Sequence, residues 1–161
     1  MSRYAEGTTV PVERTRAEIE ATLSRFGATE FGYVTRPKGA VIEFLVRGRR
    51  VRFVLPLADR NDPKFTRTPQ RGHRRSGVAS GKAWDGDCRQ RWRTLALCIK
   101  AKLAAVTEGI VEFDREFMPH IVDPVTGATM AELVLPAIAD RYEGIANNAG
   151  GLLCLPAPED T

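Results

Sequence analysis

The sequence predicts an α+β domain, in which three antiparallel strands stand between helices along the chain. Three short segments, residues 28–35, 40–47 and 50–57, are rich in β-branched and aromatic residues and are separated by turn residues. Helical patterns precede and follow them, at 15–27 and 87–107. Hydrophobic residues make up 43% of the 161 residues, which is enough for the core of one domain.

We place this single domain at residues 1–143 and expect a flexible tail at 144–161. No apolar run approaches the roughly 18 residues that a membrane span requires. The first ten residues also lack the apolar centre of a signal peptide. The expected location is therefore the cytoplasm, with no membrane partner.

The first helix is predicted over residues 15–27. Its apolar residues share one side: Ile19, Leu23 and Phe26. Thr15 and Glu18 have the spacing of a capping box at the helix start, and Gly27 suits the helix end. We expect this helix to pack on the sheet.

The second and third strands are predicted to form a hairpin with a two-residue turn at Gly48 and Arg49. A turn that begins with glycine favours type II′ and places Val46 opposite Val51. One face of the hairpin is then wholly apolar. A slip by one residue would bury Arg52, so the hydrophobic pattern determines the two faces.

In this register the second face of the hairpin carries a cluster of arginines: Arg47, Arg49, Arg50 and Arg52. Arg47 stands opposite Arg50, and like charges in this position destabilise a sheet. A protein that binds phosphates gains from the cluster, because each neutralised phosphate releases counterions. The alternative is a soluble hairpin tip whose charges protect the sheet edge.

Residues 58–86 show no periodicity and are rich in glycine, proline and arginine, so we predict a long loop there. The segment QRGHRRSG at 70–77 is its most basic part. We interpret this loop as a mobile clamp that orders when it closes on a polyanion.

The longest helix is predicted over residues 87–107, with Asp87 as its N-cap. A core stripe runs along it: Cys88, Trp92, Leu95, Ile99, Leu103 and Val106. Arg89, Arg93 and Lys100 share another, basic face. Trp84 precedes the helix, where it could stack on a base or cover the helix end.

The C-terminal part is acidic and predicts two more helices. The first lies within residues 108–121, with Ile110, Phe113 and Phe117 as its apolar side. Thr129 and Glu132 cap the second, which Pro136 should kink or confine to short turns.

Charge is distributed unevenly along the chain, although the net charge is only +4. Residues 47–102 hold 16 of the 24 Lys and Arg residues but only four of the 20 Asp and Glu residues. A basic middle between acidic ends indicates a polyanionic partner. A solvated basic surface without a partner is the alternative.

Signatures of catalysis are mostly absent from the sequence. It has no phosphate-cradling glycine loop and no GxSxG motif. His73 and His120 stand far apart, and the three cysteines lack the spacing of a zinc site, so we expect small buried thiols, no metal and no cofactor. A small metal-dependent nuclease that uses Asp85 and Asp87 is the enzymatic alternative.

The segments RFVLPL, CRQRWRTLALCIKAKL and EFMPHI resemble a group of small, poorly characterised proteins of phages and prophages, over most of residues 4–142. This resemblance implies a viral or mobile-element origin and no catalytic residues. The order helix, three strands, helix is also similar to double-stranded RNA-binding domains and to single-strand annealing proteins. The second similarity implies a basic groove for a nucleic-acid backbone and a homo-oligomer.

We therefore expect a phage-type nucleic-acid-binding protein without catalysis of its own, acting in annealing, recombination or replication, with single-stranded DNA or RNA favoured. The residues expected to bind are Arg47, Arg49, Arg50, Arg52, Arg71, His73, Arg74, Arg75, Lys82, Trp84, Arg89, Arg93 and Lys100. The alternative is a phage accessory protein whose basic surface binds an acidic host protein to disarm a defence system.

Overall fold

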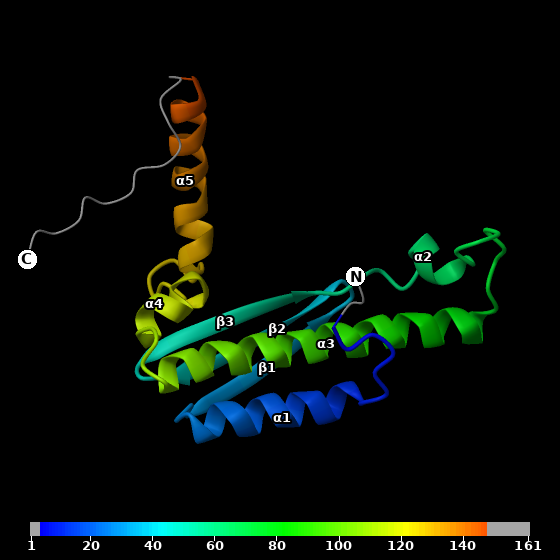
Figure 1. Ribbon diagram of the computed structural model, residues 1–161, viewed down its shortest axis with the longest axis horizontal. Helices are drawn as coiled ribbons and strands as arrows, with labels where there is room; N and C mark the ends of the chain where they lie inside the picture. Colours follow the sequence, from blue (N-terminus) through cyan, green and yellow to red (C-terminus); the bar gives the residue numbers. More distant parts are fainter. Residues whose placement is uncertain (1–3, 148–161) are drawn as a thin grey trace, which may run out of the picture.

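The computed structural model describes residues 4–147 and has the predicted α+β architecture (Figure 1). A helix and three strands come first: α1 (Val12–Arg25), β1 (Glu30–Arg36), β2 (Gly39–Val46) and β3 (Arg49–Pro56). Helices follow: α2 (Pro63–Thr66), α3 (Gly77–Thr107), α4 (Phe113–Phe117), the short 3-10 helix η1 (Met118–His120) and α5 (Met130–Asn147).

The three strands form an antiparallel sheet in the order β1-β2-β3, and α1 and α3 pack side by side on one of its faces (Figure 1). Side chains that alternate along the strands fill this covered face: Ala40, Ile42, Phe44, Val46, Val51, Phe53 and Leu55. Apolar side chains of the two helices pack against this face, and each is at most 2% exposed: Ile19 and Leu23 of α1, and Trp92 and Ile99 of α3. The predicted apolar stripes of both helices therefore form the core.

The β2–β3 hairpin has the predicted faces but a different register. Val46 pairs with Arg49 rather than Val51, a shift of two residues that leaves the side chains within the two strands on their predicted faces. The turn residues are Arg47 and Gly48, with φ of 51° and 72°. Positive φ at both positions belongs to a type I′ turn, so the predicted type II′ turn at Gly48 and Arg49 was wrong.

The start of α1 differs from the prediction. The helix begins at Val12, three residues before Thr15, and Thr15 is fully buried. The Thr15 hydroxyl donates to the Pro11 carbonyl at 3.3 Å, as threonines do within helices. The predicted capping box was therefore wrong, and the Glu18 carboxylate binds elsewhere.

Helix α3 is ten residues longer than predicted, because it begins at Gly77. The Ser76 hydroxyl caps it by accepting from the Ala79 backbone N–H at 3.3 Å. Asp87 lies inside the helix and is not its cap. With 31 residues and about 1.5 Å of rise per residue, α3 is roughly 46 Å long and extends well beyond the sheet (Figure 1).

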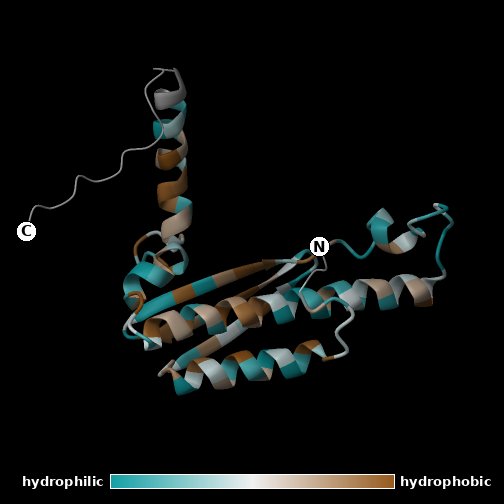
Figure 2. Cartoon of the chain, viewed as in Figure 1, coloured by the Kyte–Doolittle hydropathy of each residue, from teal (hydrophilic) through white to brown (hydrophobic). Residues whose placement is uncertain are grey.

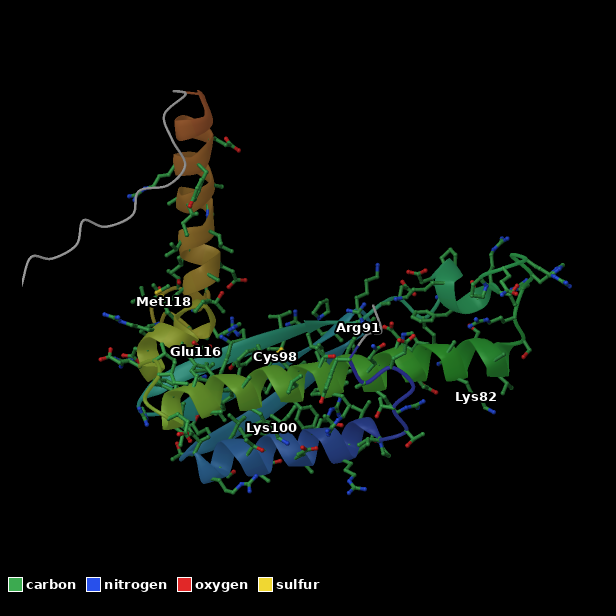
Figure 3. The ribbon with its side chains drawn as sticks, viewed as in Figure 1. Lys82, Arg91, Cys98, Lys100, Glu116 and Met118 are labelled. Carbon is green, nitrogen blue, oxygen red and sulfur yellow. The ribbon has the colours of Figure 1, made fainter. Side chains whose placement is uncertain are left out.

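The two cysteines of α3 lie in opposite environments. Cys88 is buried, and burial, followed by the charges of Asp87 and Asp85, raises the pKa of its thiol to about 11. Cys98 is exposed, so its predicted burial was wrong (Figure 3). Cys154 lies outside the described residues.

The C-terminal capping box is confirmed. The Glu132 carboxylate accepts from the Thr129 backbone N–H at 2.7 Å, and the Thr129 hydroxyl accepts from the Glu132 N–H at 3.3 Å. Helix α5 then continues through Pro136 to Asn147, so Pro136 does not confine it to short turns as predicted. It therefore includes the first residues of the predicted tail, and residues 148–161 lie outside the described part of the chain.

Two further observations complete the fold. Ile110 is 78% exposed, so it does not belong to the apolar side of α4, which Phe113 and Phe117 form. Among residues 4–147, no helix combines the length and apolar composition that a membrane crossing needs.

Candidate nucleic-acid interface

The most basic part of the structure is a projecting segment, residues 60–82, which we call the basic arm. It contains α2, the following loop and the first turns of α3, at the end of the molecule farthest from α4 (Figure 1). Residues 60–82 include seven Lys and Arg residues but a single acidic residue, Asp62. Figure 2 shows the loop of the arm as continuously hydrophilic.

The loop of the arm has a defined structure. Arg67 and Arg74 lie opposite each other in an antiparallel bridge. The backbone N–H of Thr68 donates to the His73 carbonyl at 2.8 Å, and Gly72 takes φ of 62° at the bend. The prediction of a long structureless loop was therefore wrong, because local turns and the extended α3 account for most of residues 58–86.

Two contacts anchor the arm on α3. Phe65 of α2 is 4% exposed, and the Asp62 carboxylate caps α2 by accepting from the Lys64 N–H at 2.9 Å. The Lys64 ammonium lies 3.5 Å from the Asp87 carboxylate. The arm is thus held by an apolar side chain and one ion pair.

Trp84 stabilises the base of the arm. Its indole N–H donates to the Ala58 carbonyl at 2.9 Å, and the Arg60 guanidinium lies over its ring at 5.6 Å. A Cβ atom at Gly81 would lie 3.3 Å from the same guanidinium, so the glycine admits Arg60 to the helix surface. Because α3 begins at Gly77, Trp84 lies inside the helix and not before it, so the predicted cover of the helix end was wrong. Its contacts instead join α3 to the segment that follows β3.

The outer side chains of the arm carry uncompensated charge. Arg67, Arg71, Arg74 and Lys82 are exposed. Arg75 is half-buried, and its guanidinium donates to the Phe65 carbonyl at 3.5 Å. Within residues 4–147, none of these five side chains forms an ion pair.

The arginines of the hairpin, in contrast, have partners. Arg49 bonds to Asp114 at 3.1 Å. Arg52 binds Glu43 and donates to the Gly127 carbonyl at 2.8 Å. Arg50 lies 3.9 Å from both Glu30 and Glu43, and the Arg47 guanidinium lies over the rings of Phe26 and Phe113. The predicted opposition of Arg47 and Arg50 was wrong, because Arg47 occupies the turn.

The predicted basic face of α3 is directed toward the N-terminal segment. Arg93 and Lys100 both bind the Glu18 carboxylate of α1, and Figure 3 shows Lys100 reaching toward that helix. The hydrogen bonds from Lys100 and Arg93 lower the pKa of Glu18 and outweigh its burial. Arg89 donates to the Thr8 carbonyl at 3.1 Å. These three cations are therefore occupied within the fold.

Asp85 and Asp87 stand two positions apart in α3, so their side chains leave the helix in different directions. Partial burial acts to raise the pKa of Asp87, but the hydrogen bond from Arg91 and the charges of Arg91 and Lys64 outweigh it and lower that pKa. In the described part of the chain, no three His, Cys, Asp or Glu side chains are placed to hold a metal ion.

The structure thus separates the thirteen predicted site residues into two groups. The arm brings together Arg71, His73, Arg74, Arg75 and Lys82, and Trp84 lies at its base. The hairpin and the α3 face lie elsewhere, and most of their cations pair with acids. The arm also contains Arg60 and Arg67, which the sequence analysis did not include. Both residues belong to the basic stretch at 47–102, so the charge distribution could have indicated them. The bridge that places Arg67 opposite Arg74 could be found only from the fold.

Comparison with known proteins adds no relative: a scan against protein-family models, a search of curated proteins and a search of solved structures each find no match.

Proposed function

We propose that this protein binds nucleic acid through the basic arm, mainly by contacts to the phosphate backbone and with little sequence specificity. The observation that carries the proposal is the opposition of Arg67 and Arg74 at an exposed bridge, without an ion pair in the described residues. Like charges opposite each other destabilise a strand pair by a few tenths of a kcal/mol or more. A phosphate that binds between two guanidinium groups reverses this cost, since arginine forks match its oxygens.

The placement of the remaining charges supports the same site. Acidic residues pair with most of the cations of the hairpin and the α3 face, whereas the arm gathers five cations without an ion pair in the described residues. We favour single-stranded DNA or RNA as the partner. The cations of the arm gather around one short bridge, and most of them lie in the loop before α3 instead of along the helix. A phage-type role in annealing, recombination or replication would use such a site.

A salt titration of binding to a fluorescent single-stranded oligonucleotide tests the proposal. If about six cations of the arm each engage a phosphate, the logarithm of affinity falls with the logarithm of salt concentration with a slope of about −4. Affinity then falls by roughly 300-fold between about 50 and 200 mM salt. Absence of binding to DNA and RNA even at low salt would refute the proposal.

Matched variants locate the site. Arg71→Ala with Arg74→Ala removes two charges from the arm and should make the salt slope less steep by about one to two. Arg25→Ala with Arg115→Ala removes the same charge at the opposite end of the molecule, from exposed positions of α1 and α4. This control should bind almost as the natural protein does. Equal losses in both variants would indicate a diffuse electrostatic effect instead of a site.

A further inference from the structure

The base of the basic arm adjoins a hollow of about 350 Å³. The start of α1, the end of β1 and a stretch of α3 line this hollow. Its volume lies within the roughly 300–1,000 Å³ of pockets that hold small ligands. Trp84 belongs to both places, because it lines the hollow and its indole N–H also holds the base of the arm. The hollow is therefore a neighbour of the proposed nucleic-acid site.

Aromatic and apolar side chains of α3 form one wall of the hollow. Trp84, Cys88 and Trp92 follow one another at steps of four residues, so they share one side of the helix. Trp92 is 2% exposed and Cys88 is 6% exposed, whereas Trp84 is half-buried. The Trp84 ring is therefore the aromatic surface on which a planar ligand can stack.

Arg16 of α1 is held in a fixed position at the hollow. Its guanidinium lies over the rings of Tyr33 and Trp92, 4.4 and 4.6 Å from their centroids, and Nη2 donates to the Thr35 hydroxyl at 3.0 Å. Nε is buried without a hydrogen-bond partner, and Arg16 forms no ion pair within residues 4–147. A guanidinium that is partly removed from water and lacks a counter-charge gains free energy from an acceptor that binds at its remaining donors.

The hollow also presents acceptors. Glu13 of α1 and Asp85 of α3 line it, are exposed and form no ion pair in the described part of the chain. Arg89 adds a second guanidinium, so the two arginines and the two acids of the hollow balance. Such a site does not favour a simple anion. It suits a neutral planar group whose edges carry both donors and acceptors, as nucleobases do.

We propose that the hollow takes one unpaired base of the strand that the arm binds, and that it prefers guanine. This inference rests on the proposed function, because the arm supplies most of the affinity. Guanine presents the acceptors O6 and N7, which an arginine recognises, and beside them two adjacent N–H donors, which a carboxylate accepts. Arg16 on α1 and Asp85 on α3 offer these two partners. Adenine, cytosine and thymine each lack the pair of adjacent donors.

The position of the hollow suits a strand that already lies on the arm. Trp84 follows Gly77, the first residue of α3, by seven positions, which is roughly 10 Å along the helix axis. A base inside a duplex is stacked and paired, so it cannot enter the hollow without leaving the helix. Binding of one base here therefore also separates single strands from duplexes. It adds a modest base preference to contacts that are otherwise made with the backbone.

Two single-stranded DNAs test the proposal with the full chain: one of thymines only, and the same DNA with one central guanine. The guanine-containing DNA should bind at least about fivefold more tightly at equal salt concentration. Its binding should also quench the intrinsic fluorescence of the protein, because both tryptophans of the chain line the hollow. If the salt titration identifies RNA as the partner, uracil RNA replaces the thymine DNA.

Asp85→Asn tests whether the hollow recognises the base. Asp85 is exposed, so this variant should fold normally. The ratio of the two affinities should fall to about one, because an amide cannot accept both donors of guanine as a carboxylate does. Glu20→Gln is the matched control, since it removes the same charge from an exposed position of α1 outside the hollow. This control should keep the preference for guanine, and far-ultraviolet circular dichroism verifies that both variants are folded.

The outcomes separate this inference from the proposed function. Equal affinity for the two DNAs, with the salt slope intact, would overturn the base site and leave the function of the arm standing. Absence of binding to DNA and RNA at low salt would overturn both. A preference that survives Asp85→Asn, or that a central adenine reproduces, would show that guanine is not recognised in the hollow.

Discussion

Arg67 lies directly opposite Arg74 across an antiparallel bridge at the tip of the basic arm. The backbone bonds around them, from Thr68 to His73 and from Arg75 to Thr66, hold the two arginines in this arrangement. Like charges directly opposite each other destabilise a strand pair, whereas opposite charges stabilise it. The fold therefore maintains a local repulsion, which an anion can relieve.

Arg67→Ala should weaken binding to nucleic acid without lowering the stability of the protein. Removing one of the two like charges should leave the free energy of unfolding unchanged or raise it by a few tenths of a kcal/mol. The same change should weaken binding to a single-stranded oligonucleotide and reduce the salt slope by about one. Chemical unfolding and the salt titration measure the two effects. A loss of stability of more than about 1 kcal/mol would show that Arg67 has a structural role instead.

Charge reversal should lower the free energy of unfolding more at Arg52 than at Arg50. The Arg52 side chain is 26% exposed, and it binds Glu43 and the Gly127 carbonyl. Arg52→Glu sets two carboxylates side by side and should destabilise the protein by about 1–3 kcal/mol. The Arg50 side chain is 56% exposed with two distant partners, so Arg50→Glu should cost less than about 1 kcal/mol. Equal effects in urea unfolding would contradict the ion-pair geometry.

Phe44→Ala tests the assignment of the covered face. Phe44 is 2% exposed and stacks with Phe53 at 6.3 Å between ring centroids. Removing the ring should lower the free energy of unfolding by about 3–5 kcal/mol. Leu97→Ala, at a position of α3 that is 42% exposed, is the control and should change stability by less than about 1 kcal/mol. A neutral Phe44→Ala variant would show that the sheet faces are reversed.

His120 should make stability depend on pH near neutrality. Burial, and then the charge of Lys102, lowers the pKa of His120 below its ordinary value of 6.5. The unfolded chain therefore binds a proton more readily than the folded protein. The contribution of His120 to stability is complete above about pH 6.5 and declines as the pH falls below that value. Urea unfolding across this range measures the decline.

His120→Phe is the matched variant for the pH dependence, because it preserves an aromatic ring against Phe53, where the centroids lie 4.1 Å apart. Stability of this variant should vary less between pH 5 and pH 7 than that of the natural protein. If stability declines equally in both proteins, titratable groups other than His120 cause the pH dependence.

The strand faces could be predicted from the sequence because side chains alternate with period two. A shift of two residues in the β2–β3 pairing keeps Phe44 and Val51 on the covered face, so the hydrophobic pattern cannot detect it. Arg47 and Gly48 occupy the turn, and an arginine with positive φ is an uncommon choice. Residue preferences alone therefore predicted the turn one position later, at Gly48 and Arg49.

The charge pairing could not be predicted, because it joins residues far apart in the chain. Glu18 binds Arg93 and Lys100, which follow it by more than seventy positions. Asp114 binds Arg49 in the same way. Only the packing of α1 and α4 against the other elements brings these acids to the basic segments. The sequence identified a basic region, whereas the fold determines which part of it remains uncompensated.

The arm projects at one end of the long helix α3, and acidic partners neutralise the basic residues nearer the sheet. A cluster of unpaired positive charge therefore lies at one end of the molecule, away from the sheet. The field of a charged polymer acts on such an off-centre charge cluster with a torque. A molecule that diffuses toward an extended anion would rotate before contact and arrive with residues 60–82 in front.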